Sequence, residues 1–220
     1  MDFPRGGAIY FDPTNSQFQM QAAFLLSFDP SPCATIRSMP VDDPTDLPVA
    51  ATNLFTSADV IAILWERGWL ASEPTPEQLA WCEHAAAILG GHAADRGALA
   101  DLLGLVFHYD AREIISRVES HAVLSRYAGR DVIRQMGLLL LDGAPLTSDR
   151  FKEIVTALKG GLESGGRELF HPIRLSLAGR AGEGELDRII LLLDEAAELS
   201  FAVPVKSART RILEFCATLD

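Results

Sequence analysis

The chain has 220 residues, a formal net charge of −11, and 48% hydrophobic and 22% charged residues. This composition is typical of a globular protein, and the acidic balance argues against broad, non-specific binding to DNA, RNA or acidic membranes. No apolar run approaches the roughly 20 residues of a membrane span, and the first residues lack the basic and apolar regions of a secretion signal. Three widely spaced cysteines without a CxxC pair indicate reduced thiols and a cytoplasmic location.

Residues 1–50 differ in composition from the rest of the chain. They hold seven of the twelve prolines, which break helices because proline lacks the amide donor. Between the prolines, the apolar runs "AIYF" and "FQMQAAFLLSF" are compatible with a small β-hairpin. We therefore expect a Pro-rich arm without a core of its own, and its apolar surface predicts that it packs against the remainder of the protein.

From residue 51 onward the pattern becomes helical. Thr56 and Asp59 have the spacing of a capping box, and Gly68 is a suitable stop for the helix that follows. The stretch "TPEQLAWCEHAAAILGG" predicts the clearest helix in the chain. Thr75 is its cap, a proline occupies its first position, Gln78 completes the box, and two glycines end it.

Five further helices are expected from apolar residues at helical spacing. They cover residues 96–107, 111–127, 130–141, a segment capped by Ser148 with the stripe Phe151, Ile154, Val155 and Leu158, and a segment with the stripe Leu186, Ile189, Ile190 and Leu193. A last helix is expected over about 207–219. The sequence thus predicts an all-α bundle of seven or eight helices, divided into helical subdomains at 51–145 and 146–220.

Signatures of catalysis and metal binding are missing from the sequence. We find no phosphate-binding GxxxxGK[ST], no GxGxxG, no GxSxG and no HExxH motif. Cys82 and His84 are two residues apart, which places them on different faces of a helix, so we expect no metal site and no cofactor. The adjacent carboxylates Asp194 and Glu195 are expected to lie on a solvated helix face. The sequence therefore predicts a protein that is not an enzyme.

Three tryptophans and one basic segment raise the question of nucleic-acid binding. Trp65, Trp69 and Trp81 lie within one predicted helix-turn-helix, and their spacing favours core packing over a base-stacking platform. Residues 146–182 carry six Lys and Arg against four Asp and Glu, whereas 1–50 and 51–145 are both acidic. The six cations of this segment are Arg150, Lys152, Lys159, Arg167, Arg174 and Arg180.

The same segment contains the run "GGRELFHPIRLSLAGR", in which a lone arginine follows a proline within apolar residues. Phe170-His171-Pro172-Ile173-Arg174, the apolar residues up to Gly179, and "GEGELDRIILLLDE" resemble the C-terminal anticodon-binding region of bacterial glutamyl-tRNA synthetases. In that family, Phe-x-Pro-Leu-Arg precedes a small-apolar segment ending Thr-Gly and a further helix. A weaker similarity covers "LAWCEHAAAILGGHAADRGALADLLGLVFHYD", so the resemblance extends over about residues 75–200.

The resemblance implies a helical cage in which Arg174 approaches anticodon bases. A guanidinium can stack on a base or make paired hydrogen bonds to base edges and phosphates. Around Arg174, the local charge adds Arg167, Arg180, Lys152 and Lys159 as further RNA-binding candidates. The alternative is a structural Arg174, buried and bonded to a carboxylate or to backbone carbonyls.

The chain also departs from the family. The catalytic half, with its nucleotide-binding fold and signature motifs, is absent, and Ala178 replaces the motif threonine. Three functions are therefore considered. The first is a stand-alone module that binds a tRNA anticodon arm, with tRNA-Glu as the expected ligand. The second is an acidic protein-interaction module that kept the cage but lost RNA binding, with a partner such as a synthetase. The third is an enzyme of unrecognised type, for which the sequence offers no candidate residues.

Overall fold

The computed structural model describes residues 54–126 and 128–219. The expected arm, with its hairpin and its packing, lies outside these residues. The described residues belong to one compact unit. Its described residues form ten α-helices and one short 3₁₀ helix, and they contain no strand. The helices are α1 (Ser57–Glu66), α2 (Pro76–Leu89), η1 (Gly90–His92), α3 (Arg96–Phe107), α4 (Ala111–Ser116), α5 (Val118–Leu124), α6 (Gly129–Leu139), α7 (Ser148–Leu162), α8 (Arg167–Ala178), α9 (Glu185–Glu198) and α10 (Ala208–Leu219).

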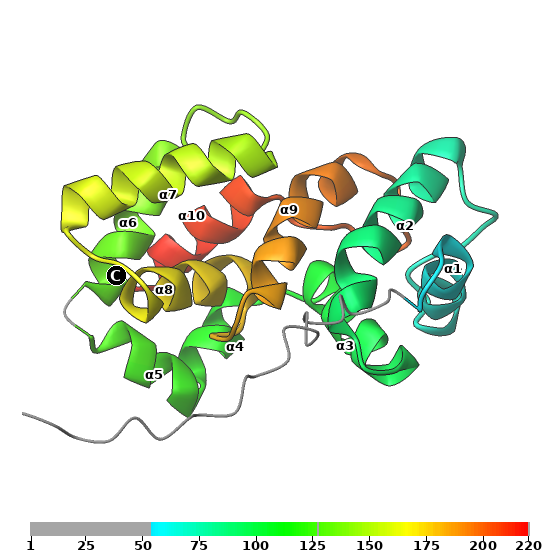
Figure 1. Cartoon of the computed structure of the whole chain (residues 1–220), viewed down its shortest axis with the longest axis horizontal. Helices are drawn as coiled ribbons and strands as arrows, with labels where there is room; N and C mark the ends of the chain where they lie inside the picture. Colours follow the sequence, from blue (N-terminus) through cyan, green and yellow to red (C-terminus); the bar gives the residue numbers. More distant parts are fainter. Residues whose placement is uncertain (1–53, 127, 220) are drawn as a thin grey trace, which may run out of the picture. The chain divides into compact units, whose positions relative to one another are not determined.

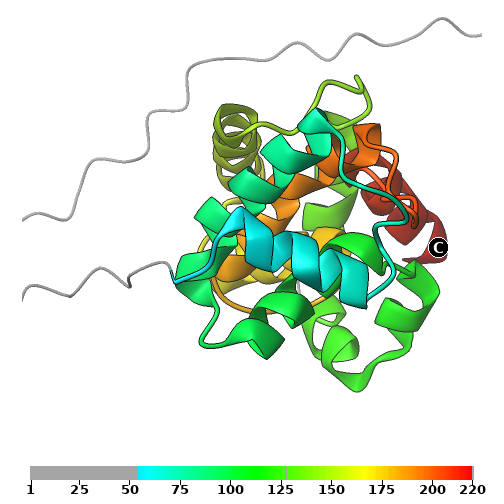
Figure 2. The same ribbon diagram turned by 90° about the vertical axis from the view of Figure 1, so that its right-hand side faces the viewer.

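Figure 1 shows how these helices are arranged. α6, α7, α8 and α10 pack at one end, α1, α2 and α3 at the other, and α9 lies between the two groups. α9 contacts α2, α3 and α8, while α6 packs against α7, α8 and α10. Figure 2, which looks from the side of α1, shows α1 and α2 in front of α9. One hydrophobic core therefore runs through residues from both sides of position 145.

The predicted helix starts are confirmed for α1 and α2. Asp59 accepts the backbone N–H of Thr56 at 2.8 Å, and Thr75 and Gln78 bond each other's backbone amides at 2.9 and 3.3 Å. Gly68 follows α1 with φ +70°, a conformation that glycine adopts without strain. The local signals therefore set the boundaries of these two helices.

Two other boundaries were predicted wrongly. The helix expected over 111–127 is two helices, because Arg117 between α4 and α5 has an extended backbone at φ −71° and ψ 141°. The cap of α7 is Thr147 rather than Ser148, since the Thr147 hydroxyl accepts the backbone N–H of Arg150 at 3.3 Å. Either hydroxyl could have capped this helix, so the sequence alone did not decide between them.

Aromatic packing confirms part of the tryptophan prediction. Trp69 stacks on Phe107 with ring centroids 4.5 Å apart, and Trp81 meets Phe107 and Phe201 edge to face. Both tryptophans are buried. Trp65 is different, because it lies on the outward side of α1 and is 45% exposed. Two of the three tryptophans therefore belong to the core, which leaves no stacked platform for bases.

Candidate functional site

Arg174 lies in the middle of α8 and its side chain is only 9% exposed. Its Nε and Nη2 donate to the two carboxylate oxygens of Asp187 at 2.7 and 2.8 Å, and its Nη1 donates to the carbonyl of Gly182 at 2.5 Å. Of the two expected environments, the structure has the buried one with a carboxylate and a carbonyl as partners. The expectation of an accessible guanidinium is therefore wrong, because this paired geometry uses the donors that a base would need.

The proline of the motif does not interrupt the helix that carries Arg174. Pro172 lies inside α8. It cannot donate a hydrogen bond to the carbonyl four residues earlier, at Glu168, and this residue is exposed to water. A single helix thus carries Phe170 and His171 on one turn and Arg174 on the next. Arg174 stands within apolar residues because it anchors α8 to α9.

Phe170 lies beside both Arg174 and Lys159 of α7. The Arg174 guanidinium carbon lies 5.1 Å from the centre of the Phe170 ring, and the Lys159 ammonium lies 5.7 Å from it. Such contacts favour a cation beside an aromatic face. Phe170 is half-buried. It therefore joins a structural arginine to an exposed lysine of the neighbouring helix.

The other four predicted residues are all exposed. The Lys152 side chain is 71% exposed and pairs with Asp149 at 2.9 Å, while Arg167 is 76% exposed and lies 3.6 Å from Glu183. Lys159 and Arg180 are exposed as well. Ion pairs between exposed side chains contribute little stability, so they yield easily to another anion. These four cations are available for binding, in contrast to Arg174.

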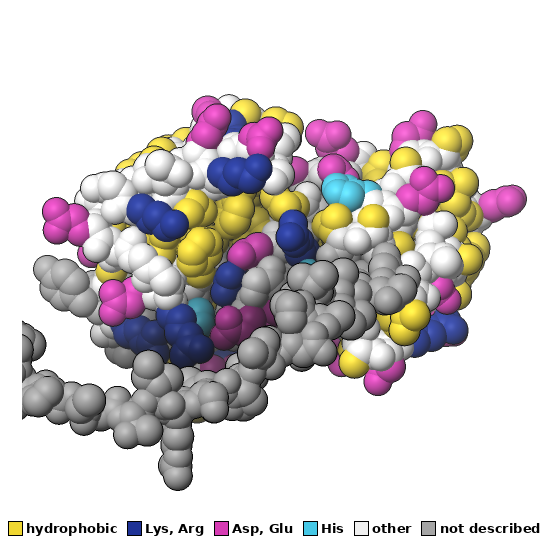
Figure 3. All heavy atoms as spheres, in the orientation of Figure 1, with side chains coloured by type: hydrophobic (Ala, Val, Ile, Leu, Met, Phe, Trp, Pro, Cys, Tyr) yellow, Lys and Arg dark blue, Asp and Glu magenta, His cyan; other side chains and the backbone are white. Residues whose placement is uncertain are grey.

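Figure 3 shows the face of the molecule that carries these residues. Apolar side chains gather in a hollow between α7 on one side and α8 and α9 on the other, and Lys and Arg side chains stand around it with some Asp and Glu side chains among them. The half-buried apolar residues of these helices include Leu162, Phe170 and Leu191. α7 packs mainly along α6, which leaves the side toward α9 open. The molecule thus combines an apolar floor and a basic rim on one face.

His171 marks a second concentration of positive charge, at the start of α8. Its pKa lies below the usual value because of partial burial and the nearby guanidinium groups of Arg126, Arg174 and Arg167, while Glu183 acts in the opposite direction. Among the described residues, the buried Nε2 of His171 has no hydrogen-bond partner. Neither His171 nor Arg126 was predicted from the sequence. Arg126 belongs to the acidic segment 51–145, so a count of charges by segment does not reveal it.

Two carboxylates have structural roles that the sequence did not predict. Asp187 holds Arg174, as described above. Asp194 was expected to be solvated, yet its oxygens accept the backbone N–H groups of Leu146 at 2.6 Å and Ala208 at 2.7 Å. It thereby ties the start of α10 and the segment before α7 to α9. Carboxylate partners that are distant in sequence cannot be found from local spacing.

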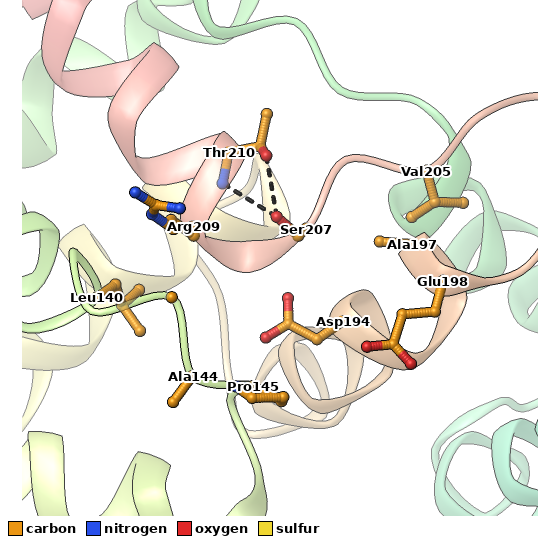
Figure 4. A pocket seen from close by; sticks show the side chains of 11 residues that line it. Leu140, Ala144, Pro145, Asp194, Ala197, Glu198, Val205, Ser207, Arg209 and Thr210 are labelled. Carbon is orange, nitrogen blue, oxygen red and sulfur yellow. Dashed lines mark hydrogen bonds between the residues drawn. The ribbon is translucent and has the colours of Figure 1, made fainter.

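Asp194 also borders the polar cavity shown in Figure 4, which has a volume of about 380 Å³. The cavity lies between α9, the loop before α7 and the start of α10. Within it, the Ser207 hydroxyl accepts the backbone N–H of Thr210 at 3.2 Å and bonds the Thr210 hydroxyl at 2.9 Å. These groups cap α10, and Asp194 is already bonded on both oxygens. Asp194, Ser207 and Thr210 therefore have structural roles in the wall of this cavity.

Cys82 and His84 have separate environments. Cys82 is fully buried and burial raises the pKa of its thiol to about 12, whereas His84 is partly exposed and its Nδ1 lies 2.8 Å from the Glu195 carboxylate. Within 54–126 and 128–219, no group of three or more His, Cys, Asp or Glu residues is arranged to hold a metal ion. None of the helices in this part of the chain is long and apolar enough to cross a membrane.

Comparison of the chain with protein-family models, curated proteins and solved structures gave no match. The similarity to the anticodon-binding region of glutamyl-tRNA synthetases therefore remains a prediction from the motif residues.

Proposed function

We propose that this chain is a non-catalytic binding module that recognises a protein partner through the hollow between α7, α8 and α9. The observation that carries the proposal is the apolar floor with a basic rim on the face seen in Figure 3. The pairing of Arg174 with Asp187 and Gly182 supports it further. A base-reading site needs donors that point outward, whereas an apolar hollow fits aliphatic or aromatic side chains of a protein.

The chemistry of the rim indicates the kind of partner. Lys152 and Lys159 are seven residues apart and lie on one side of α7, and Arg188 of α9 is exposed. An amphipathic helix with an apolar face and acidic flanks complements such a hollow. Its apolar side chains would enter the hollow, and its carboxylates would meet the rim. A subunit or enzyme that presents such a helix, including a synthetase, is the partner we propose.

Binding of a tRNA anticodon arm, with tRNA-Glu as the ligand, is the second candidate function. It is favoured by the exposure of Lys152, Lys159, Arg167 and Arg180, which could contact phosphates without Arg174. The net charge of −11 opposes it. For either function we propose a cytoplasmic location, and the thiol form of Cys82 and Cys216 supports it.

Selection from a library of helical peptides tests the first function. We expect the selected peptides to carry apolar residues three and four positions apart with flanking Asp or Glu. The double variant Lys152→Glu and Lys159→Glu reverses the charge at two positions of the rim. It should weaken peptide binding about tenfold or more, which corresponds to ~1.4 kcal/mol of binding free energy. Fluorescence anisotropy measures this change. The matched control is Arg112→Glu on α4, an exposed arginine outside this face, which should leave the affinity unchanged.

The same variants separate the two candidate functions. Filter binding of tRNA-Glu and a non-cognate tRNA at two salt concentrations should show no cognate preference if the module binds a protein. Selection of basic peptides, or equal loss of binding in the rim and control variants, would contradict the protein-binding proposal. Cognate tRNA binding that weakens with salt and is lost in the rim variant would establish the second candidate instead.

A further inference from the structure

The cavity in Figure 4 has charged groups of opposite sign on its two sides. Arg209 of α10 lies on one side and Glu198 of α9 on the other, with the carboxylate of Asp194 between them. The volume of about 380 Å³ is in the range of sites that hold small molecules. Lys152 and Lys159, which belong to the rim of the protein-binding hollow, do not line this cavity. A ligand bound here is therefore independent of the proposed protein partner.

The two outer charges of this cavity are free to bind a ligand. Within the described part of the chain, neither the Arg209 guanidinium nor the Glu198 carboxylate has a hydrogen bond or an ion pair. Asp142 is close enough to Arg209 for their charges to interact, but its carboxylate is bonded to Arg150. Asp194 differs from both, because each of its oxygens already accepts a backbone N–H group. Structural bonds thus hold the middle of the cavity, whereas the charged groups on its two sides lack partners.

The side of the cavity that carries Arg209 has the donors that a carboxylate needs. Guanidinium groups bind carboxylates through paired hydrogen bonds. The hydroxyl groups of Ser207 and Thr210, which also line the cavity, are bonded to each other at 2.9 Å, and Ser207 accepts the backbone N–H of Thr210. Whichever hydroxyl donates to the other, one of the two hydroxyl protons has no acceptor among the described residues. This proton and the guanidinium can both be donated to a carboxylate.

The opposite side of the cavity favours a cation. Glu198 is the last residue of α9, and the last turn of this helix contains no basic residue. The unpaired carbonyls at a helix C-terminus carry partial negative charge, which stabilises a cation beside them. Between the two sides, Leu140, Pro145 and Val205 provide apolar contacts for a hydrocarbon chain. The cavity thus has a place for a carboxylate, a place for a cation and an apolar wall between them.

We propose that this cavity binds a free ω-amino acid, a small zwitterion in which a short hydrocarbon chain separates an ammonium group from a carboxylate. The ligand carboxylate bonds to the Arg209 guanidinium and to the free hydroxyl proton, and the ligand ammonium bonds to the Glu198 carboxylate. A ligand with only a carboxylate is repelled by Glu198 and Asp194, and a ligand with only an ammonium group is repelled by Arg209. In an α-amino acid the two charges are too close together to reach both sides.

Titration with 4-aminobutanoate tests this site, with butanoate and butylamine as ligands that each carry one of its two charges. The backbone amide signals of Gly143, Ala197 and Thr210 are followed by NMR, because these residues line the cavity. We expect 4-aminobutanoate to shift these signals saturably. Each singly charged ligand should bind about tenfold more weakly, since one charge-assisted contact is lost. Glycine should also bind more weakly than 4-aminobutanoate, because its two charges cannot reach both sides of the cavity.

Two variants assign the ends of the ligand to the two sides of the cavity. Arg209→Gln should weaken the binding of 4-aminobutanoate about tenfold without weakening that of butylamine. Glu198→Gln should weaken the binding of 4-aminobutanoate to a similar extent without weakening that of butanoate. The matched controls are Arg112→Gln on α4 and Glu119→Gln on α5, both at exposed positions, and they should leave the affinity unchanged.

Several results would overturn the proposal. These are the absence of saturable shifts, binding of butanoate or butylamine as tight as that of 4-aminobutanoate, tighter binding of glycine, and unchanged affinity in Arg209→Gln. Circular dichroism checks that each variant is folded, and the ligand series on the unaltered protein decides the matter if one is not. The peptide selection at the hollow uses other ligands and other variants, so failure of one proposal is distinguishable from failure of the other.

Discussion

At the scale of single residues, Arg174 and His171 lie three positions apart on α8 and have opposite environments. The Arg174 guanidinium is paired with Asp187 and Gly182, and this pairing raises its pKa further above its usual value. The imidazole of His171 is surrounded by arginines and has an unbonded nitrogen. The motif arginine is thus a structural group with bonded partners, while the histidine beside it has a buried nitrogen to which no described group is bonded.

Arg174→Ala should lower the free energy of unfolding by about 3 kcal/mol, because it leaves the carboxylate of Asp187 without its partner. Urea unfolding measures this change. Arg188→Ala, on the exposed side of α9, is the matched control and should change stability by less than about 0.5 kcal/mol. If Arg174→Ala were as stable as the control, the buried pair would have no structural role.

The low pKa of His171 predicts a pH dependence of stability. A histidine whose pKa is lowered by folding binds fewer protons in the folded state than in the unfolded state. Its contribution is therefore fully present above the unfolded pKa of about 6.5 and is lost as the pH falls toward the lower folded value. His171→Gln should flatten this part of the stability curve, measured by urea unfolding between neutral and mildly acidic pH. A parallel curve for the variant would exclude the effect.

At the scale of helices, the glycine of the motif ends α8 for two physical reasons. Gly179 has φ +77°, and a Cβ at this position would lie 3.1 Å from the Cδ1 atom of Ile114 on α4. The Gly179 N–H donates to the Leu175 carbonyl, and its own carbonyl accepts from Arg117 at 3.1 Å. The residue therefore closes α8 and brings it against the junction of α4 and α5, which a side chain would prevent.

Gly179→Ala should accordingly destabilise the protein by about 1–2 kcal/mol, from a left-handed backbone and a close contact with Ile114. Gly165→Ala is a suitable control, since a Cβ at residue 165 would have no atom within 4 Å and its φ is not in the left-handed range. Thermal unfolding of both variants gives the comparison. Similar melting temperatures for the two would contradict this account of Gly179.

These helices also show which structural features could be predicted from the sequence. Caps such as Thr75 and stripes such as Leu186 to Leu193 are local, and they predicted the helical class and most helix positions. The break at Arg117 was missed because its extended backbone reflects tertiary contacts, including the bond from its side chain to Gly179. The environment of Arg174 depends on Asp187, thirteen residues away. A count of charges by segment could not show that the charge of Arg126 acts on His171 in the folded protein.

At the scale of the whole molecule, Arg211 joins three helices. This residue of α10 is fully buried, and its guanidinium donates to the carbonyls of Leu105 and Val106 on α3 and Leu177 on α8, at 2.5–2.9 Å. The Tyr109 ring lies 4.6 Å from the guanidinium carbon. Burial lowers the pKa of Arg211 to about 10, so it is still charged at neutral pH. The partial negative charge at two helix C-termini stabilises it.

Arg211→Met should lower the free energy of unfolding by about 3–5 kcal/mol, because several buried carbonyls lose their donor at once. Hydrogen exchange should show faster opening of both α3 and α8. Arg209→Met, two residues earlier and exposed, should affect neither. Loss of protection confined to α10 would mean that Arg211 does not connect the three helices.

The position of Arg211 along the chain has a consequence for how the protein forms on the ribosome. The polypeptide emerges from its N-terminal side, so α3 and α8 are complete before residue 211 is added. Until then, the carbonyls at their ends have only water as a partner. Assembly of the bundle should therefore finish late and in one step, when α10 leaves the exit tunnel and inserts its cation between helices that were made long before it.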